Sequence, residues 1–287
     1  MRSAFLSLLQ AAEPEGGGFD IPSMIMHHLV DSHEIELPGG RVWHLPQFEP
    51  VHLGPLTIDF SITKHVVFMI IAAALVALLL ILAARDAKRE QAAGAERGPK
   101  GAANVVEAAV LFIRDEIALK NIGHGGEKFV PYIVAVFFFI LFCNLLGLLP
   151  YAFTVTSHII VTAAMAIFVF VGVTIVGIVQ HGFKFFTYFV PQGAPMWLIP
   201  IMIPIEILSY FIRPLCLSVR LFANMVAGHV MLAVIGGFVF AMGVWFGWIP
   251  LAFVTVLFGL ELLIACLQAY VFTILTCIYL HDAIHLH

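Results

Sequence analysis

The sequence predicts an all-α polytopic membrane protein, and three observations support this fold class. Apolar residues make up 61% of the chain and charged residues only 11%, unlike the average soluble protein. The mean hydropathy is +1.02. Several apolar runs reach the roughly 20 residues that a helix needs to cross a bilayer core. The lipid bilayer is therefore the expected environment, and a formal net charge of -4 gives no basic surface for nucleic acid.

The first 64 residues predict an extracytoplasmic arm without regular structure. Residues 19–64 are acidic, rich in Pro, Gly and His, and contain no long apolar run. The opening stretch, MRSAFLSLLQAA, has one arginine and a short apolar core, which fits both a cleaved signal peptide and an interfacial helix. Residues 65–287 predict the membrane domain.

A first transmembrane helix is predicted from about residue 65 to residue 84, where the chain is almost wholly apolar. Lys64 precedes this run, and a cluster of basic residues follows it: Arg85, Lys88, Arg89, Arg97 and Lys100. Because Lys and Arg accumulate in cytoplasmic loops, the N-terminal arm is expected outside and residue 85 inside.

The next segment predicts an amphipathic helix on the cytoplasmic membrane surface. Apolar residues recur at helical spacing on one face, namely Val106, Ala109, Val110, Ile113 and Ile117. Charged residues occupy the other face, namely Glu107, Arg114, Asp115 and Lys120. A transmembrane hairpin follows, with helices at 129–149 and 158–180 joined by YAFTVTSH, and Lys184 places the next connection inside.

The apolar run from Met196 to about Met242 allows two interpretations. As one helix of about 46 residues it would extend roughly 70 Å, which fits a bilayer core of about 30 Å only at an unusually steep tilt. As two ordinary spans it would break near Arg220. Lengths and charges favour two spans, which would leave the C-terminus outside after the last apolar run, at about 250–280.

A polar stripe interrupts this run. At 100° per residue Arg213 lies about 20° from Arg220, and Glu206, Ser209 and Asn224 fall within about 40° of Arg220. Charge inside a bilayer is costly, so such a stripe faces protein or water and indicates function. Glu206 and Arg213, seven residues apart, also fit a structural ion pair. Arg220 has no acidic neighbour within two turns, so its counter-charge must come from another helix or another protein.

Two further groups lie near this stripe in the sequence. His229 falls on the opposite helical face, and Glu261 and Gln268 share one face of the last apolar run. A carboxyl group among apolar residues favours its protonated form, which suits Glu261 to proton exchange. Interhelical hydrogen bonding explains Ser209, Asn224 and Gln268 equally well.

The stretch RPLCLSVRLFANMVAGHVML, followed by ELLIACLQAYVFTILTCIYL, resembles the subunit a family of F-type ATP synthases. The arginine of RLF.N and the downstream LQA..F helix are specific to that family, and NLLGLLP and TSHIIVTAAMA extend the resemblance from about residue 60 to the C-terminus. The resemblance implies that 196–242 and 250–280 are two long, steeply tilted helices packed against a c ring. It overrides the preference for two spans and implies a cytoplasmic C-terminus.

By that resemblance, Arg220 is the essential arginine that faces the ring carboxylates and separates two offset aqueous half-channels. The outer half-channel is implied to contain His229 and Glu261, with Asn224 and Gln268 between them and Arg220. Some bacterial members carry the acid and the histidine in the opposite order.

The inner half-channel is implied to contain Glu206 and Ser209. Cys216 stands where the family often has a hydroxyl residue, one turn before the arginine, which leaves the inner path less well defined by the resemblance.

The implied function is proton translocation through the membrane sector of an F-type ATP synthase, which couples proton flow to ring rotation and ATP synthesis. The implied partners are the c-subunit ring, the b-subunit peripheral stalk and the rest of the complex, in a bacterial plasma (inner) membrane. This chain would be a non-catalytic stator subunit of the rotary motor. It has no Gly-rich phosphate-binding loop, so no nucleotide site is predicted on it, and neither a cofactor nor a metal is expected.

A secondary transporter is the alternative, because buried charge beside Pro-interrupted helices also forms substrate sites. It predicts inverted internal repeats, and the two halves show no convincing self-similarity. A metal-dependent membrane enzyme fits less well, because the chain has no HExxH motif. His281 and His285 have a spacing that suits a metal, but a polar helix end explains them more simply.

Overall fold

The computed structural model describes residues 34–37, 41–44, 46, 51–53, 56–58, 63–92, 102–123, 125–148, 155–189 and 197–285. The chain divides into two compact units. The larger comprises Asp31–Gly228 with Gly259–His287, and the smaller includes His229–Phe258. The signal peptide or interfacial helix considered for the start of the chain lies outside the described residues.

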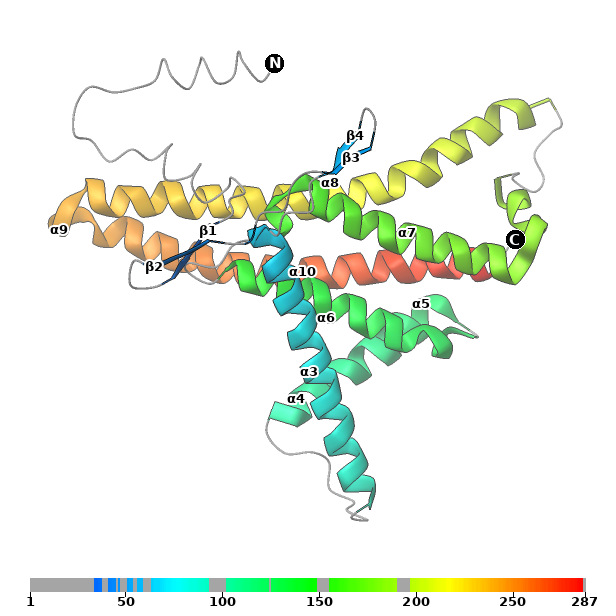
Figure 1. The fold of residues 1–287 in the computed structure, drawn as a ribbon, viewed down its shortest axis with the longest axis horizontal. Helices are drawn as coiled ribbons and strands as arrows, with labels where there is room; N and C mark the ends of the chain where they lie inside the picture. The colour runs from blue at the N-terminus through cyan, green and yellow to red at the C-terminus, as the bar shows by residue number, and fades with distance from the viewer. Residues whose placement is uncertain are drawn as a thin grey trace. The chain divides into compact units, whose positions relative to one another are not determined.

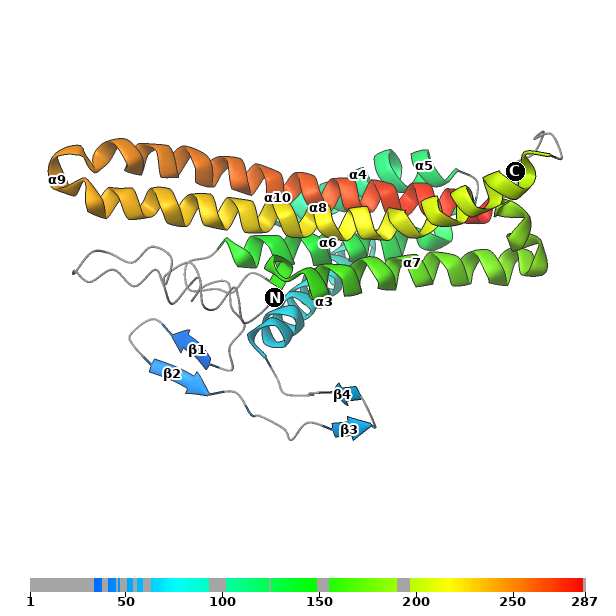
Figure 2. The same cartoon turned by 90° about the horizontal axis from the view of Figure 1, so that it is seen from above.

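The N-terminal arm contains two short antiparallel hairpins, a feature that the sequence did not predict (Figures 1 and 2). Strand β1 (Glu34–Leu37) pairs with β2 (Arg41–His44), and β3 (Val51–Leu53) pairs with β4 (Leu56–Ile58). Strands of three or four residues are too short to show a clear alternation of apolar and polar residues, so the arm was expected to be irregular.

Five of the described helices are long and apolar enough to cross a membrane. The candidate spans are Lys64–Arg85, Gly126–Gly147, Ile159–Phe185, Ile199–Val239 and Trp248–Ile284, two of which include an adjoining 3-10 turn. The corresponding helices are α3 (Lys64–Ala92), α6 (Val130–Gly147), α7 (Ile159–His181), α8 (Ile199–Ala241) and α10 (Trp248–Ile284). The predicted all-α polytopic fold class is confirmed.

Helix α8 runs without a break through 43 residues, with Pro204 and Pro214 inside it. The expectation of two spans, drawn from length and charge, is therefore wrong, and the single helix expected from the family resemblance is correct. Length reasoning failed because it assumes a helix near the membrane normal. At 1.5 Å per residue α8 is roughly 65 Å long, so it stays within an apolar core of about 30 Å only at a steep tilt.

The predicted amphipathic segment comprises α4 (Ala102–Phe112), the π-helical turn η1 (Ile113–Leu119) and α5 (Lys120–Ile122). Ile113 and Ile117 are fully buried, whereas Arg114, Asp115 and Lys120 are exposed. The division into two faces agrees with the prediction. The π-helical turn was not predicted, because the sequence pattern was compared only with the 3.6-residue period of an α-helix.

The core of the larger unit forms where η1, α6, α7, α8 and α10 meet. Figures 1 and 2 show α8 and α10 side by side in this unit, with α6 and α7 along them. The buried members from these elements include Ile113, Ile117, Ile133, Phe138, Val173, Leu217, Leu221, Phe272 and Leu280. This packing presents one face of α8 and of α10 to the core and leaves the other face uncovered by the described residues of the larger unit.

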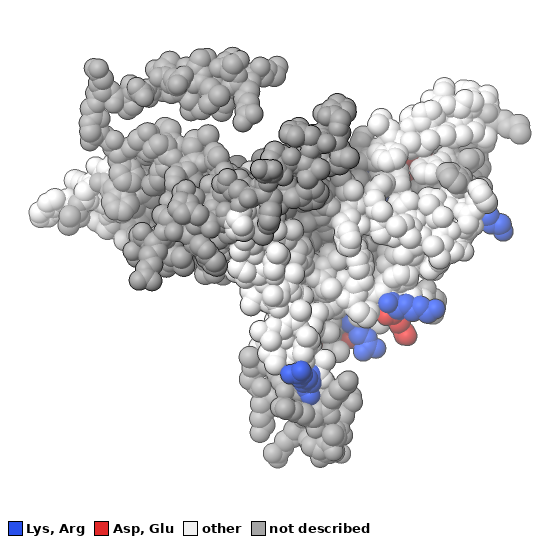
Figure 3. All heavy atoms as spheres, in the orientation of Figure 1, with Lys and Arg blue, Asp and Glu red and all other residues white. Residues whose placement is uncertain are grey.

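Charged side chains gather at one edge of the larger unit. Figure 3 shows blue and red atoms near the C-terminal end of α3, near α5 and beyond the end of α7, whereas the other described atoms of this face are almost all white. The exposed charged residues in these segments include Arg85, Glu116, Lys120, Glu127, Lys128 and Lys184. Such an arrangement is typical of a membrane protein with one charged aqueous side.

The smaller unit contains the end of α8, the short helix α9 (Gly243–Phe246) and the start of α10. Gly243 has a φ of 66°, a left-handed conformation that favours glycine, where the chain leaves α8. Trp245 and Trp248 are 87% and 65% exposed. Exposed tryptophans at a helix end are typical of the boundary between bilayer and water.

Candidate functional site

The middle of α8 has a buried apolar face and an exposed polar face. Leu217, Leu221 and Met225, spaced by four residues, are 4% exposed or less and pack into the larger unit. Arg220 and Asn224 lie on the exposed face. No hydrogen bond or ion pair joins the Arg220 guanidinium to any residue within the described ranges. An apolar helix thus presents a permanent positive charge outward with no partner from the described part of its own chain.

Gln268 joins α10 to α8 at this arginine. Its Nε2 atom donates a hydrogen bond to the backbone carbonyl of Arg220 across 3.4 Å, and its side chain is only 5% exposed. Because Gln268 contacts the backbone, the guanidinium itself stays available. The amide therefore holds the two helices in register at the point where the charge lies.

Glu261 is buried on α10 and packs against Gly228 of α8. The residue is 4% exposed, and neither carboxylate oxygen hydrogen-bonds to a described residue. A Cβ atom built on Gly228 would lie 2.7 Å from the Glu261 Cδ atom and would overlap Oε1. The glycine therefore makes the space in which the carboxyl group sits. A buried carboxyl group that no hydrogen bond holds is available for proton exchange.

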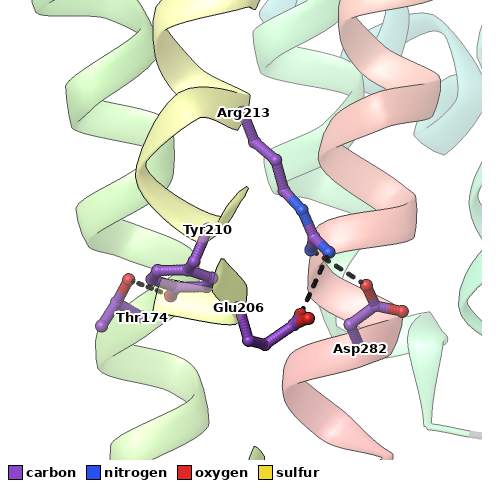
Figure 4. Close-up of polar contacts among 5 residues, drawn as sticks. All are labelled: Thr174, Glu206, Tyr210, Arg213 and Asp282. Atoms are coloured by element: carbon purple, nitrogen blue, oxygen red, sulfur yellow. Dashed lines mark hydrogen bonds and ion pairs between the residues drawn. The ribbon is translucent and has the colours of Figure 1, made fainter. Parts of the chain in front are cut away.

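Arg213 forms an ion-paired cluster farther toward the N-terminus of α8 (Figure 4). Its Nη2 atom lies 3.9 Å from Oε1 of Glu206 on the same helix, and its Nη1 atom donates to Oδ2 of Asp282 on α10 across 3.3 Å. The centroid of the Tyr279 ring lies 5.6 Å from the guanidinium carbon of Arg213. The Glu206–Arg213 pair anticipated from their spacing is present, with a second acidic partner.

Sequence reasoning missed Asp282, which lies between the two histidines, His281 and His285, that were explained by a polar helix end. The signal was available: Asp282 lies fourteen residues after Gln268, about 40° from it on an ideal helix. A small cavity of about 20 Å³ lies beside this cluster, next to Tyr210 and Tyr279, and is large enough for one water molecule. Tyr210 hydrogen-bonds to Thr174 of α7 at 2.7 Å (Figure 4).

Two other predicted residues, Ser209 and Asn224, take no part in these contacts. Ser209 is half-buried on α8, and neither its side chain nor that of Asn224 forms a hydrogen bond with a described residue. His229 is half-buried and belongs to the smaller unit. The structure thus brings together Glu206 with Arg213, Gln268 with the Arg220 backbone, and Glu261 with Gly228.

Buried polar side chains of the α6–α7 hairpin, also missed by sequence reasoning, contact both long helices. Asn144 of α6 donates to the backbone carbonyl of Ala265 on α10 across 3.3 Å. Thr162 of α7 shares a hydrogen bond of 3.2 Å with Ser218 of α8. Asn144 and Thr162 are fully buried, so these bonds fix α8 and α10 on the hairpin.

Comparison with known proteins gives consistent matches. The family described as ATP synthase A chain matches residues 66–281. The chain is 47% identical over 245 residues to ATP synthase subunit a of Pelagibacter ubique (strain HTCC1062), covering 84% of this chain and 97% of that protein. It is 45% identical over 280 residues to ATP synthase subunit a of Parvibaculum lavamentivorans (strain DS-1), covering 96% and 97%.

Proposed function

Because the chain belongs to the ATP synthase A chain family, we propose that it translocates protons through the membrane sector of an F-type ATP synthase with Arg220 as its essential charge. It is a multi-pass membrane subunit of that complex. In this proposal two offset aqueous half-channels lead to a ring of c subunits. Each proton crosses the bilayer on a ring carboxylate, and the resulting rotation drives ATP synthesis in the soluble sector. The chain itself contributes no catalytic nucleotide site.

The single observation that carries this proposal is the exposed charge of Arg220 in an apolar span, with no ion-pair partner among the described residues. A guanidinium stays protonated at any relevant pH, so it attracts each arriving ring carboxylate into its charged form and promotes release of the proton. The same charge repels protons and therefore prevents a direct leak between the two half-channels. The exposed faces of α8 and α10 provide the surface that would contact the c ring.

The outer half-channel contains Glu261 and His229, with Asn224 and Gln268 between them and Arg220. Support comes from the burial of the Glu261 carboxyl group and from the hydrogen bond that fixes Gln268 at the Arg220 backbone. Protons pass from the outer side to Glu261 and His229, and then to a ring carboxylate.

The inner half-channel contains Glu206 and Ser209. The cavity beside the Arg213 cluster supports a hydrated path at this end of α8, and Asp282 adds a second carboxylate to it. Arg213 balances these two carboxylates and so serves a structural role.

The orientation is that of a bacterial inner-membrane protein. Residues 1–64 form an arm outside, residues 65–287 form the membrane domain, and the C-terminus is cytoplasmic. The gathering of charged side chains at one edge of the larger unit supports an inner side there (Figure 3). The b-subunit peripheral stalk and the c ring are the expected neighbours.

The test is Arg220→Gln in the intact complex, in membrane vesicles with assembly verified. ATP-driven proton pumping and passive proton permeability are both recorded. Loss of pumping together with increased leak supports both roles of the charge. Arg114→Gln is the matched control. Arg114 is exposed, lies in η1 and not in α8, and forms an ion pair with Asp115 at 3.6 Å. Normal pumping by Arg220→Gln refutes the proposed role.

A further inference from the structure

We propose that His65 and His158 form a proton-carrying pair that feeds the outer half-channel. The inference rests on the proposed function for the direction of proton flow and for the orientation of the chain. The pair lies where α3 and α7 begin, which is the outer end of both helices in that orientation. Imidazole is the side chain that most readily gains and loses a proton near neutral pH.

The two rings are in direct contact although they are far apart in the sequence. His65 is the second residue of α3, and His158 immediately precedes α7. Their centroids lie 3.9 Å apart with an angle of 76° between the ring planes. His65 is 5% exposed and His158 is half-buried. One ring of the pair is therefore enclosed by protein while the other is partly open.

A small apolar cluster holds the pair in place. Ala72 of α3, Cys143 of α6 and Val155 are fully buried and pack together, with Phe68 and Val161 against them. Phe68 follows His65 by three residues and Val161 follows His158 by three, so the cluster lies one helical turn from each ring. The packing fixes the start of α3 to the tip of the α6–α7 hairpin.

The contact makes the two rings one proton site. With the ring centroids 3.9 Å apart, a proton can pass between the two rings directly or through one water molecule. Two titratable groups of the described ranges adjoin the pair in sequence or belong to the cluster: Lys64, which precedes His65 and is 9% exposed, and Cys143.

Buried polar groups lead from this pair toward both site helices. Two residues before His158, Thr156 donates from its Oγ1 to the Asn144 Oδ1 atom across 3.1 Å, and Asn144 reaches the carbonyl of Ala265. Ala265 lies one turn after Glu261 on α10. Thr156 and Asn144 are fully buried, so this polar connection runs through an otherwise apolar interior.

A second branch leads toward Arg220. The Thr162 hydroxyl lies 3.4 Å from the His158 carbonyl oxygen, to which it can donate a hydrogen bond. The same hydroxyl also forms a hydrogen bond of 3.2 Å with the hydroxyl of Ser218, which lies two residues before Arg220. Polar groups of this kind give water molecules the two to four partners they need in an apolar interior. A proton released by the pair thus has polar surroundings in the direction of Glu261 and of Arg220.

The experiment uses vesicles that contain the complex stripped of its soluble sector, with a fixed imposed membrane potential. Passive proton flow is measured while the outer pH is varied from about 6 to 9, around the usual titration range of imidazole. We expect His65→Gln and His158→Gln each to lower the flow by about tenfold at the alkaline end, below the 10²- to 10⁴-fold effects of a full acid–base group. At the acid end, where protons are abundant, the loss shrinks.

Two further readouts separate proton transfer from packing. The double variant is expected to be no slower than the slower single variant, because the pair acts as one site. External imidazole is expected to restore flow through His65→Ala and His158→Ala. His181→Gln, at the opposite end of α7, serves as the control and keeps a side chain able to hydrogen-bond to the Ile284 carbonyl, which His181 contacts at 2.7 Å.

Wild-type flow in both single variants at every pH overturns the inference. A loss that is equal at every pH and that imidazole does not restore also overturns it, because it identifies the pair as structural. Glu261→Gln is measured in parallel. If Glu261→Gln stops the flow while the histidine variants conduct normally, only the inference about the pair fails. If Glu261→Gln conducts normally, the proposed function fails.

Discussion

Replacing Gly228 by alanine should impair proton delivery by moving Glu261. A Cβ atom at this position would lie 2.7 Å from the Glu261 Cδ atom, whereas ordinary contacts are 3.4–4 Å. The carboxyl group must therefore move by about 0.7 Å or more, a shift that costs little stability because it affects the far end of a flexible side chain but that displaces the reacting group. Since a displacement of about 1 Å in a reacting group costs up to about 100-fold in rate, we expect proton-driven ATP synthesis to fall by roughly 10- to 100-fold.

The assay is ATP synthesis in vesicles driven by an imposed proton gradient, with the amount of assembled complex measured alongside. Gly236→Ala is the matched control, because a Cβ atom there meets nothing within 4 Å. Adding Glu261→Asp to Gly228→Ala shortens the acid by one methylene and should recover part of the activity. Wild-type synthesis by Gly228→Ala, or a loss fully explained by poor assembly, refutes the reasoning.

Three other predictions concern the same helices. Glu261→Gln should stop or greatly slow proton-driven ATP synthesis while the complex still assembles, since the amide keeps the shape but carries no exchangeable acid proton; normal ATP-driven pumping contradicts this. Asp282→Asn should lower the free energy of unfolding by about 1 kcal/mol, because its ion pair with Arg213 is about one-third exposed, and thermal inactivation measures it. Asn144→Leu removes the bonds to Ala265 and Thr156 and should destabilise assembly by about 1–3 kcal/mol; unchanged detergent resistance of the complex would count against a stabilising role.

Much of the fold followed from apolar run length and charge alone. The helix limits of the α6–α7 hairpin and the two faces of the amphipathic segment agree with the structure because burial in lipid or protein requires long apolar stripes. Run length could not decide whether α8 is one helix or two, because a helix in a large assembly need not lie along the membrane normal. The specific RLF.N motif decided that question where physical length could not.

The candidate site was only partly predictable. The Glu206–Arg213 pair followed from helical spacing, which is a local property. Asp282 and Asn144 were missed because their partners lie on other helices: the shared helical face of Gln268 and Asp282 was readable in the sequence, but it does not state which helix that face touches. The packing of Glu261 against Gly228 was likewise invisible, since a glycine leaves no side chain by which its neighbour can be recognised.

The outward-facing Arg220 also bears on how the complex is built. Exposure of a charge to the bilayer core costs at least about 2.5 kcal/mol, and far more by some measures, until an opposite charge arrives. In the proposed assembly, a copy of this subunit made without the c ring carries that cost in full, together with a bare apolar surface on two long helices. Such a copy therefore has a higher free energy than the assembled subunit. The residue proposed to control proton flow thus also favours assembly of the subunit with its proposed partner.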